Sequence, residues 1–496
     1  MDPAVESPHA ALRSPEPPPS GTRFAARERI DLVCDPGTTR VIRSAVRSRR
    51  IGARAQPGDG VVAASGEIQG RPVFCYAQDA RFVGGSLGEA HAETILRVLS
   101  LAADARVPVI GLIESAGARM QEATAALGAY GRIFRQTVAL SGQVPQISVI
   151  TGVSAGGGSY APALTDFIVM TKTANMFLTG PGVVKAAVGE DVTPEQLGGP
   201  LVHGRNGVAQ FVAKTEADAA FLVRDLLSYL PQHAGDDPPL VAPAGPIADN
   251  PGACVPRQTR QVYDMRDVVR AIVDAGEMLE VAPRWARNMV TGFARLDGRS
   301  IGVVANQPRH IGGVIDSEAS QKAASFVRTC DAFGIPLVVL VDTPGFLPGL
   351  RQETRGVIRH GAELLSAFAG ATVPRVTVVL RQAYGGAYIT MNAKDLGADF
   401  AYAWPRARIG IMAAQQAVSI INRREIAAAP DPEGLKAALA ESYAAEHQNA
   451  HAAAQEGFID EVILPTETRD RLCLALKTLA TKRHRPHHQW FHRRER

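Results

Sequence analysis

Apolar runs of strand length alternate with amphipathic segments of helical length along this chain. The apolar runs end near Glu114, Ile150 and Val341, and each is followed by glycine-containing turns. Residues 61–78 alternate apolar and polar positions around a turn at Gln69-Gly70, which is typical of a β-hairpin. Strands that alternate with helices predict parallel βα units, so we expect an α/β fold.

The same patterns locate the individual elements. The expected hairpins are 61–78 and 292–307, and the expected buried strands are 108–114, 145–150, 336–341 and 375–380. The expected helices are 23–32, 124–141, 216–230, 265–273, 317–333, 354–369 and 435–456.

One glycine-rich stretch, residues 151–160, links an expected strand to an expected helix. It reads Thr-Gly-Val-Ser-Ala-Gly-Gly-Gly-Ser-Tyr. Glycine lets backbone N–H groups approach a ligand closely, and a helix N-terminus adds positive potential. Two such N–H groups can hold an oxyanion. A plain turn is the competing interpretation of one such stretch alone.

The same arrangement recurs further along the chain. Val144-Pro145 and Gly156-Gly157 reappear as Val373-Pro374 and Gly385-Gly386, both at the same separation. Three further landmarks recur along the chain at a distance one residue shorter than that of the two pairs above, and we call this shorter distance the repeat separation. These landmarks are Gly70-Arg71 with Gly298-Arg299, Val83-Gly84-Gly85 with Ile311-Gly312-Gly313, and Val107-Pro108 with Ile335-Pro336. A nearly constant separation predicts an internal duplication.

The local composition of the chain indicates where the two repeated domains begin and end. We expect a Pro-rich, disordered tail at 1–22, a first domain at 23–235, a linker rich in Pro, Gly and Asp at 236–260, a second domain at 261–480 and a basic tail at 481–496.

The 496 residues carry a net charge of +4, with 46% hydrophobic and 21% charged residues, as in globular proteins. Basic residues concentrate only in the last stretch, so nucleic-acid binding is not expected. There is no apolar run of membrane-spanning length and no signal peptide, which predicts a cytoplasmic protein without a membrane partner. The five cysteines lack metal-ligand spacing, so we expect free thiols and no bound metal.

Side-chain catalysis has little support in the sequence. There is no Gly-x-Ser-x-Gly elbow, and Ser154 and Ser159 have no histidine nearby in sequence. His203 and His360 stand alone, and Asp342-Thr-Pro-Gly345 is not accompanied by a phosphate loop. Backbone amides are therefore the groups best placed to act. Two such turns would suit a reaction that develops negative oxygen on two reactants, such as thioester enolisation or polarisation of a urea carbonyl.

Longer motifs make the chain resemble a known family, the carboxyltransferase (β) subunits of biotin-dependent acyl-CoA carboxylases of the propionyl-/acetyl-CoA type. The resemblance covers about 27–471, and its motifs include Gly84-Gly-Ser-Leu-Gly-Glu89, Val153-Ser-Ala-Gly-Gly157, Val341-Asp-Thr-Pro-Gly-Phe-Leu-Pro-Gly349, Ile358-Arg-His-Gly361 and Ala383-Tyr-Gly-Gly-Ala-Tyr388. It implies two tandem crotonase-like (ClpP/crotonase) domains related by duplication.

The resemblance also implies a reaction. A carboxyl group would pass from carboxybiotin, carried on a partner protein, to the α-carbon of an acyl-CoA. Gly156 and Gly157 would hold the thioester oxygen, and Gly386 and Ala387 the ureido oxygen of biotin. Other residues implied on the acyl-CoA side are Gly84, Gly85, Ser86, Leu87, Gly88, Ala155, Gly158 and Tyr160. Those implied at the biotin and acyl pocket are Gly385, Tyr388 and Ile389.

Further subunits follow from the same resemblance. Biotin would be the cofactor, attached to a partner (α) subunit that contains the biotin carboxylase and the biotin carboxyl carrier. A small ε subunit is a further candidate partner. The family forms homohexamers, trimers of dimers, with active sites at the dimer interfaces.

Four departures from the family pattern stand out. Thr94 replaces a usual lysine, which suggests a missing contact to a CoA phosphate. Ala413-Ala-Gln-Gln416 and Asn449-Ala-His451 replace a usual Gly-Ala-x-Gly and Asn-Pro-Tyr. Ile389 stands where propionyl-type relatives often carry a polar or acidic residue. It hints at altered acyl selectivity among propionyl, acetyl and longer or branched groups, although Ile389 could equally pack in the core.

Two other functions remain open at this stage. Biotin-dependent decarboxylase subunits share nearly the same motifs. A catalytically degenerate paralogue that assembles with an active β subunit is suggested by the departures at Thr94, Ala413 and Gln416. A single-domain crotonase hydratase fits one half of the chain but not two.

Overall fold

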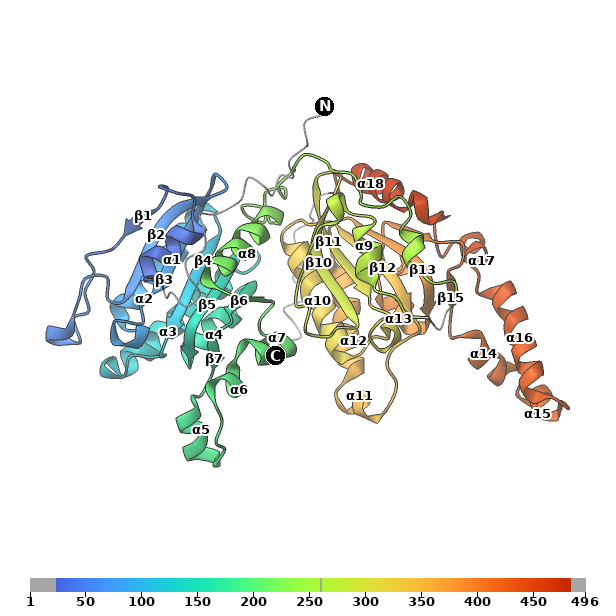
Figure 1. The fold of residues 1–496 in the computed structure, drawn as a ribbon, viewed down its shortest axis with the longest axis horizontal. Coiled ribbons are helices and arrows are strands. Elements are labelled where there is room, and N and C mark those ends of the chain that lie inside the picture. The colour runs from blue at the N-terminus through green and yellow to red at the C-terminus, as the bar shows by residue number, and fades with distance from the viewer. Residues whose placement is uncertain (1–23, 259–260, 483–496) are drawn as a thin grey trace.

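The computed structural model describes residues 24–258 and 261–482, and it shows two halves of similar construction side by side (Figure 1). Each half contains an eight-stranded sheet in which an antiparallel hairpin leads into parallel strands. The expected tail at 1–22, and all but two residues of the tail expected at 481–496, lie outside the described residues.

The first sheet has the order β1-β2-β3-β4-β5-β6-β8, with β7 paired to β5. Its strands are β1 (Arg40–Ile42), β2 (Val61–Ile68), β3 (Arg71–Gln78), β4 (Val109–Ser115), β5 (Gln146–Ala155), β6 (Phe167–Thr171), β7 (Asn175–Phe177) and β8 (Phe211–Ala213). Its helices are α1 (Ala26–Val33), α2 (Glu89–Ala105), α3 (Thr124–Leu140), α4 (Gly157–Ala163), α5 (Pro181–Val188), α6 (Pro194–Gly198), α7 (Pro200–Asn206) and α8 (Glu216–Tyr229).

The second sheet has the order β16-β14-β13-β12-β11-β10-β9, with β15 paired to β13. Its strands are β9 (Met278–Glu280), β10 (Met289–Leu296), β11 (Arg299–Asn306), β12 (Leu337–Thr343), β13 (Arg375–Tyr384), β14 (Phe400–Ala403), β15 (Arg408–Gly410) and β16 (Glu461–Val462). Its helices are α9 (Met265–Arg270), α10 (Ser317–Ala332), α11 (Leu350–Thr354), α12 (Val357–Gly370), α13 (Gly385–Thr390), α14 (Ala414–Ile421), α15 (Arg423–Ala428), α16 (Pro432–His447), α17 (Ala450–Gln455) and α18 (Thr468–Thr478).

The predicted α/β fold and the predicted duplication are both confirmed. Equivalent strands occupy equivalent places in the two sheets, and the repeat extends to single backbone contacts. An isolated parallel bridge joins Leu87 to Ala118 in the first half, and another joins Ile315 to Phe346 in the second. Both residues of the second bridge follow those of the first at the repeat separation.

Two expected helices are interrupted in the structure. The region 354–369 contains the end of α11 and then α12, because Gly356 lies between them with a φ of +75°. The region 435–456 contains α16 and α17, and the break falls at Asn449, whose side chain caps α17 by accepting the N–H of Ala452. Such capping side chains favour a new helix start over continuation.

The two halves share a hydrophobic core. The ring of Phe293 on β10 lies 6.0 Å from that of Phe167 on β6 and 6.0 Å from that of Tyr229 on α8. The segment around 240–241 also adds to the second sheet, since the Val241 N–H donates to the Gly298 carbonyl at 3.0 Å. The domain limits given above remain predictions.

Lys322 on α10 is a buried lysine at the junction between the halves. Its Nζ donates to the carbonyls of Trp285 at 3.0 Å and Met289 at 2.7 Å. The ring of Trp285 in turn lies where a Cβ on Gly207 of the first half would be, 2.6 Å away. Burial disfavours the ammonium form and lowers the pKa of Lys322 from 10.5 to about 7.

This lowered pKa predicts a pH-dependent stability. Between about pH 7 and pH 10.5 the unfolded chain binds a proton at Lys322 that the folded chain does not hold, so stability should rise with pH. Relative to Lys322→Met, the wild type should gain up to about 1.4 kcal/mol per pH unit in this window. Urea unfolding of both proteins at pH 7, 8 and 9 measures the difference, and a pH-independent difference would contradict the assignment.

Candidate active site

The first glycine turn joins β5 to α4. Gly156 precedes the helix with a φ of +56°, and its N–H donates to the Phe177 carbonyl at 3.1 Å. Gly157 and Gly158 are the first two residues of α4, so their N–H groups have no acceptor within the helix. Gly158 is buried, whereas Gly157 is partly exposed. Of the expected pair, Gly156 has its amide engaged by Phe177, whereas Gly157 has no helical acceptor and is partly exposed. The role of the pair at the thioester oxygen stays a prediction.

The absence of a side chain at Gly157 has a packing reason as well. A Cβ there would lie 2.9 Å from ring carbons of Tyr130 on α3. Tyr130 is buried, and burial raises its pKa to about 12. The Tyr130 ring thus packs against the backbone of Gly157 and limits its movement toward α3.

The second glycine turn joins β13 to α13. Gly385 has a φ of +60°, and a Cβ on it would lie 2.9 Å from the Ile411 carbonyl oxygen. Gly386 is exposed, and the nearest atom to a Cβ there would be Phe346 Cε2 at 3.9 Å. Ala387 directs its side chain into the core and is fully buried. The open side of this turn is thus at Gly386. The implied role of Gly386 and Ala387 at the ureido oxygen stays a prediction.

Each glycine turn lies beside a second loop that the sequence interpretation did not assign to the site. The loop after β4 is fixed to Leu87, whose N–H donates to Gly117 O at 2.8 Å and whose carbonyl accepts the Arg119 N–H at 2.9 Å. The N–H of Ala118 between them must point away from Leu87, because alternate residues of an extended segment point their N–H groups to opposite sides. Because β4 lies between β3 and β5, that side is the side of the first glycine turn.

The second half repeats this geometry. The Ile315 N–H donates to Gly345 O at 3.0 Å, and the Ile315 carbonyl accepts the Leu347 N–H at 2.8 Å. Phe346 takes the place of Ala118. Each half therefore has an amide at the start of a helix and a second amide in the neighbouring loop, Gly157 with Ala118 and Gly386 with Phe346. Glycine at 117 and at 345, at the repeat separation and after equivalent strands, was the sequence signal for these loops.

Residues 84–88 mainly pack against the end of β4 and the loop that follows it. A Cβ on Gly85 would lie 2.0 Å from the Glu114 carbonyl oxygen, and one on Gly88 would lie 2.4 Å from Glu122 Oε1. Leu87 is buried, and Ser86 donates its hydroxyl to the Val83 carbonyl at 2.7 Å. Among these residues, Gly84 is exposed. The acyl-CoA contacts predicted for the other four would have to come from their backbone.

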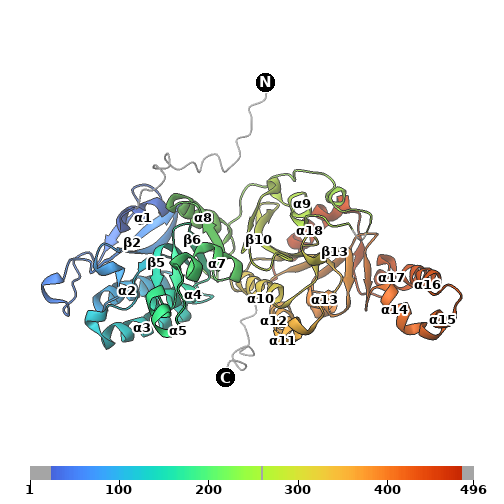
Figure 2. The same ribbon diagram turned by 60° about the horizontal axis from the view of Figure 1, so that its bottom comes forward.

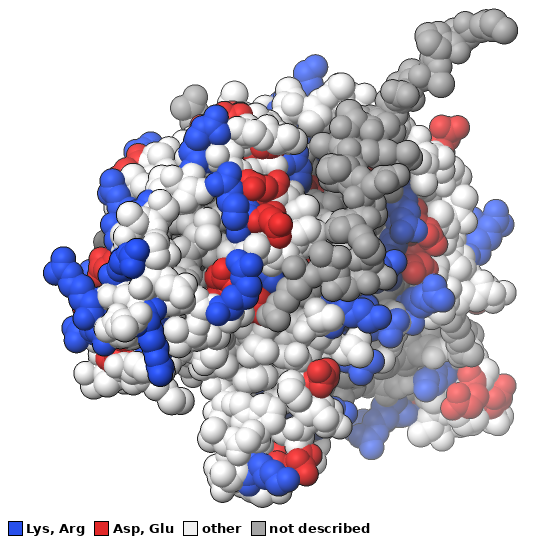
Figure 3. Space-filling model, turned by 60° about the vertical axis from the view of Figure 1, so that its left-hand side comes forward, with Lys and Arg blue, Asp and Glu red and all other residues white. Residues whose placement is uncertain are grey.

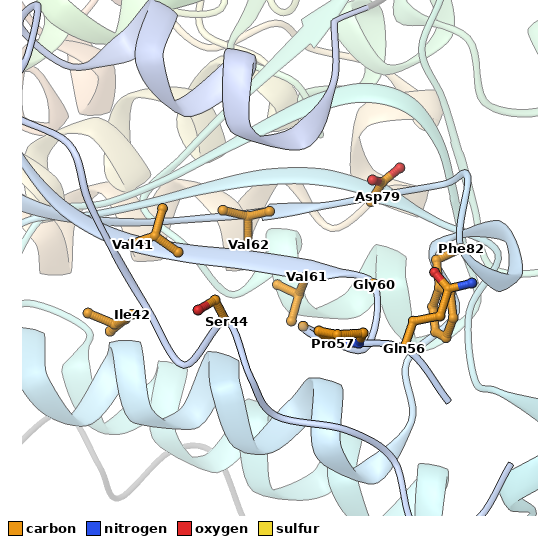
Figure 4. Close-up of a pocket in the computed structure, with 11 residues that line it drawn as sticks. Val41, Ile42, Ser44, Gln56, Pro57, Gly60, Val61, Val62, Asp79 and Phe82 are labelled. Carbon is orange, nitrogen blue, oxygen red and sulfur yellow. The ribbon is translucent and has the colours of Figure 1, made fainter. Parts of the chain in front are cut away.

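Two hollows lie beside this motif. One, of about 180 Å³, is shown in Figure 4, where Ser44, Pro57 and Val61 lie on one side and Phe82 on the other. The second, of about 630 Å³, is lined by Arg50, Glu89, Gln121, Glu122, Ala123, Thr124, Ala125, Gly128 and Arg132. Figure 3 views the molecule from its first half and shows Lys and Arg side chains over this end, with Asp and Glu side chains among them.

The remaining predicted residues take definite places. Tyr160 is 53% exposed, with its ring 6.2 Å from that of Phe134. Ala155 ends β5 and precedes the turn. Tyr388 is partly buried, donates its hydroxyl to the Phe458 carbonyl at 3.3 Å, and has its pKa raised by burial to about 12. Ile389 is 49% exposed, so the alternative that it packs in the core is wrong.

Thr94 is buried and its hydroxyl is bonded within the protein. It is 1% exposed, and its hydroxyl accepts from Arg43 Nε at 3.2 Å. Its counterpart in the second half, at the repeat separation, is Lys322, which bonds backbone carbonyls in the interior. The lost CoA contact at this position stays a prediction.

The other departures follow β15, which pairs with β13 just before the second turn. Ala413 immediately precedes α14, and Gln415 and Gln416 are exposed on it. The Gln448 amide donates to the Met412 carbonyl at 2.7 Å, which holds this segment to the end of α16. Asn449 caps α17, where a proline at 450 would also be tolerated.

A duplicated α/β fold in which both halves end a parallel strand in an amide-rich turn is that of crotonase-like enzymes. The carboxyl transferase domain family matches residues 19–494. The chain therefore belongs to this family, and it is a carboxyltransferase.

Relatives and solved structures agree. The chain is 49% identical over 470 residues to the propionyl-CoA carboxylase carboxyltransferase subunit of Haloferax mediterranei, covering 93% of this chain and 91% of that protein. It is 44% identical over 474 residues to the methylmalonyl-CoA decarboxylase subunit alpha of Veillonella parvula, covering 93% and 91%. A crystal structure of transcarboxylase 12S, described as a hexamer assembly with methylmalonyl-coenzyme A bound, matches with a TM-score of 0.91 at 46% identity, covering 94% and 91%.

Membrane-spanning helices and metal clusters are absent from the described residues. None of the helices in this part of the chain is both long and apolar enough to cross a membrane. Within residues 24–258 and 261–482, no group of three or more His, Cys, Asp and Glu side chains is placed so that it could hold a metal ion.

Proposed function

We propose that this chain is the carboxyltransferase subunit of an acyl-CoA carboxylase and moves a carboxyl group from carboxybiotin on a partner subunit to the α-carbon of an acyl-CoA. One observation carries the proposal, namely that both halves place a helix-start amide beside a bridged loop in the same way, Gly157 with Ala118 and Gly386 with Phe346. A reaction with negative oxygen on two reactants needs two such pairs.

The residues of each half would then have separate roles. Carboxybiotin, when bound, supplies the carboxyl group. The amides of Gly157 and Ala118 would hold the thioester oxygen as negative charge develops on it. The amides of Gly386 and Phe346, with Ala387 behind them, would hold the ureido oxygen. The open space at Gly386, which a Cβ would fill, fits the approach of a flat ring to the backbone.

The tyrosines beside the turns favour a site that acts through backbone amides. Burial raises the pKa of both Tyr130 and Tyr388 to about 12, so both phenols stay protonated at neutral pH. Neither can serve as the base for the α-proton. The turns would therefore act through hydrogen bonds from fixed amides, which require no change of protonation in the protein.

A second copy of the chain would complete each site. Both views place α4 and α13 in separate halves (Figures 1 and 2). Exposed apolar side chains surround each turn: Tyr160, Leu178 and Val183 near the first, and Ile358, Ile389 and Ile411 near the second. Pairing the first half of one copy with the second half of another would bury both sets. The hexamer of the 12S relative supports a trimer of such dimers.

The other subunits belong to the same proposal. Biotin would arrive on an α subunit that also carries biotin carboxylase activity, and a small ε subunit would be an additional partner. We place the complex in the cytoplasm. Propionyl-CoA is the first substrate to test, because the relative from Haloferax mediterranei is named for it.

The decarboxylase alternative is favoured by the relative from Veillonella parvula. One assay separates the two. The purified chain is incubated with a biotinylated carrier–carboxylase subunit, ATP, labelled bicarbonate and acyl-CoAs from acetyl to long-chain. We expect acid-stable label in an acyl-CoA. No label with a partner that is active with its own β subunit would overturn the proposal. Transfer from methylmalonyl-CoA to the carrier alone would support the decarboxylase.

Acyl selectivity should respond to position 389. Because Ile389 is half exposed immediately after Tyr388, its side chain borders the open side of α13. Ile389→Asp places a charge there, and we expect kcat/KM for acyl groups longer than propionyl to fall by about tenfold or more relative to propionyl-CoA. Competition assays with mixed acyl-CoAs measure the ratio. An unchanged ratio would remove Ile389 from the acyl pocket.

A further inference from the structure

A sealed ionic cluster lies behind the loop that carries Ala118. The side chains of Asp59, Arg119 and Glu122 are all 0% exposed. Arg119 Nη1 donates to Asp59 Oδ1 at 2.8 Å and to Glu122 Oε1 at 2.9 Å. Its Nη2 donates to the carbonyls of Asp59 at 3.2 Å and Ser86 at 3.0 Å. This one guanidinium therefore bonds to three different segments of the first half.

The two carboxylates extend the cluster to further backbone. Glu122 Oε2 accepts the Glu89 N–H at 2.7 Å at the start of α2, and its Oε1 accepts the Ser48 hydroxyl at 2.9 Å. Asp59 Oδ2 accepts the His91 N–H at 3.0 Å. Gly88 leaves the space that the cluster occupies, since a Cβ there would lie 2.5 Å from Arg119 Nη1. The loop after β4 is thus held from several sides.

The second half builds the same loop without any such cluster. At the repeat separation, the counterparts of Asp59, Arg119 and Glu122 are Arg287, Leu347 and Leu350. The Leu347 N–H still donates to Ile315 O, as the Arg119 N–H does to Leu87 O. The counterpart of Gly88 is Asp316, which caps α10 with its own side chain by accepting the Ala319 N–H at 2.8 Å.

The comparison of the two halves shows that this loop can form without the ionic cluster. The loop and the helix start form in the second half without buried charges, with a local cap and with the neutral Gln352 side chain, which accepts the Ser317 N–H at 3.2 Å. Burying three charged groups carries a desolvation cost that well-packed apolar residues avoid. A cluster found in the first half alone therefore indicates a requirement of that half beyond folding. Ala118, whose amide the proposed function assigns to the thioester oxygen, immediately precedes Arg119 in the chain.

We propose that Arg119 is a positioning residue that fixes the Ala118 N–H toward the thioester oxygen on the acyl-CoA side. The inference rests on the proposed carboxyltransferase function. The guanidinium is joined to rigid backbone at Asp59 and Ser86, and its own peptide follows Ala118 directly. Holding it fixes the direction of the Ala118 amide. The biotin side would tolerate the looser apolar arrangement around Leu347.

The test is Arg119→Lys, which keeps the charge but loses the fork that reaches two carboxylates and two carbonyls. We expect kcat to fall by about 10- to 100-fold, with KM for the acyl-CoA changed less than about threefold. Hydrogen exchange should speed up at residues 115–123 in this variant and stay unchanged in the second half. Glu122→Gln is the second variant, should Arg119→Lys fail to assemble.

Arg469→Lys is the matched control. Arg469 also bonds one carboxylate and two carbonyls, and its partners Ala244, Ile272 and Asp274 all lie outside both turns. We expect wild-type kcat for this control. Equal losses of kcat in Arg119→Lys and Arg469→Lys, a loss confined to KM, or wild-type kcat in Arg119→Lys would each overturn the inference. An inactive wild type would instead overturn the proposed function.

Discussion

Gly386→Ala should fold and assemble as the wild type does and lose about 100-fold or more in carboxyl transfer. The nearest atom to the added Cβ would be 3.9 Å away, and Gly386 does not have a positive φ, so the protein itself accepts the methyl group. The methyl group instead fills the open side of the turn, where the ureido ring must approach the amide. Loss of one oxyanion donor costs about 10²- to 10³-fold in comparable enzymes.

The control for this variant is Gly245→Ala. It makes the same chemical change, has nothing within 4 Å of the added Cβ, and lies outside both turns. Size-exclusion chromatography and thermal unfolding should show both variants like the wild type, and transfer should fail in Gly386→Ala alone. Wild-type transfer by Gly386→Ala would remove the second amide pair from the account.

Gly85→Ala should prevent stable folding, which is the largest stability effect we expect. Gly85 has a φ of +68°, and its Cβ would lie 2.0 Å from the Glu114 carbonyl oxygen, a backbone atom that cannot move aside. The cost should be about 4 kcal/mol or more, in the range of severe backbone and packing defects. Soluble yield and the urea midpoint measure it.

Gly84→Ala is the matched comparison, since it is the neighbouring position in the chain. Its φ is +64°, but the nearest atom to the Cβ is the Ala116 Cβ at 3.4 Å. The cost should be limited to that of a left-handed backbone, about 1–2 kcal/mol. Equal stability of the two variants would contradict the packing around Gly85 described above.

The fold was predictable because the internal duplication repeats the same sequence landmarks in both halves. Landmarks such as Gly84-Gly85 and Gly312-Gly313 recur at nearly one separation, and both pairs adopt positive φ values. Buried strands between amphipathic helices then specify parallel units. Interruptions at Gly356 and Asn449 were missed, because a helical pattern of apolar residues continues across both breaks.

The site was predictable in its position but not in its detail. Glycine at 157 and at 386 indicated amides, yet which N–H is free depends on partners far along the chain. The Gly156 amide is taken by Phe177. Ala118 and Phe346 carry no side-chain signal, because their contribution is a backbone direction set by bridges to Leu87 and Ile315. Nothing in the sequence distinguishes Arg119 from an exposed arginine, since its burial depends on segments distant along the chain.

The central claim is that one active site combines the first turn of one copy with the second turn of another. Gly157→Val, whose added side chain meets the Tyr130 ring, and Gly386→Ala can be co-expressed with different tags. The assay uses only mixed oligomers that elute as the wild type does in size-exclusion chromatography, each variant alone being inactive. A mixed dimer then holds one site with both defects and one site with none. We predict recovery of transfer toward about a quarter of the wild-type rate when pairing is random. No recovery in mixed oligomers would show that both turns of a site come from one chain and would contradict the account.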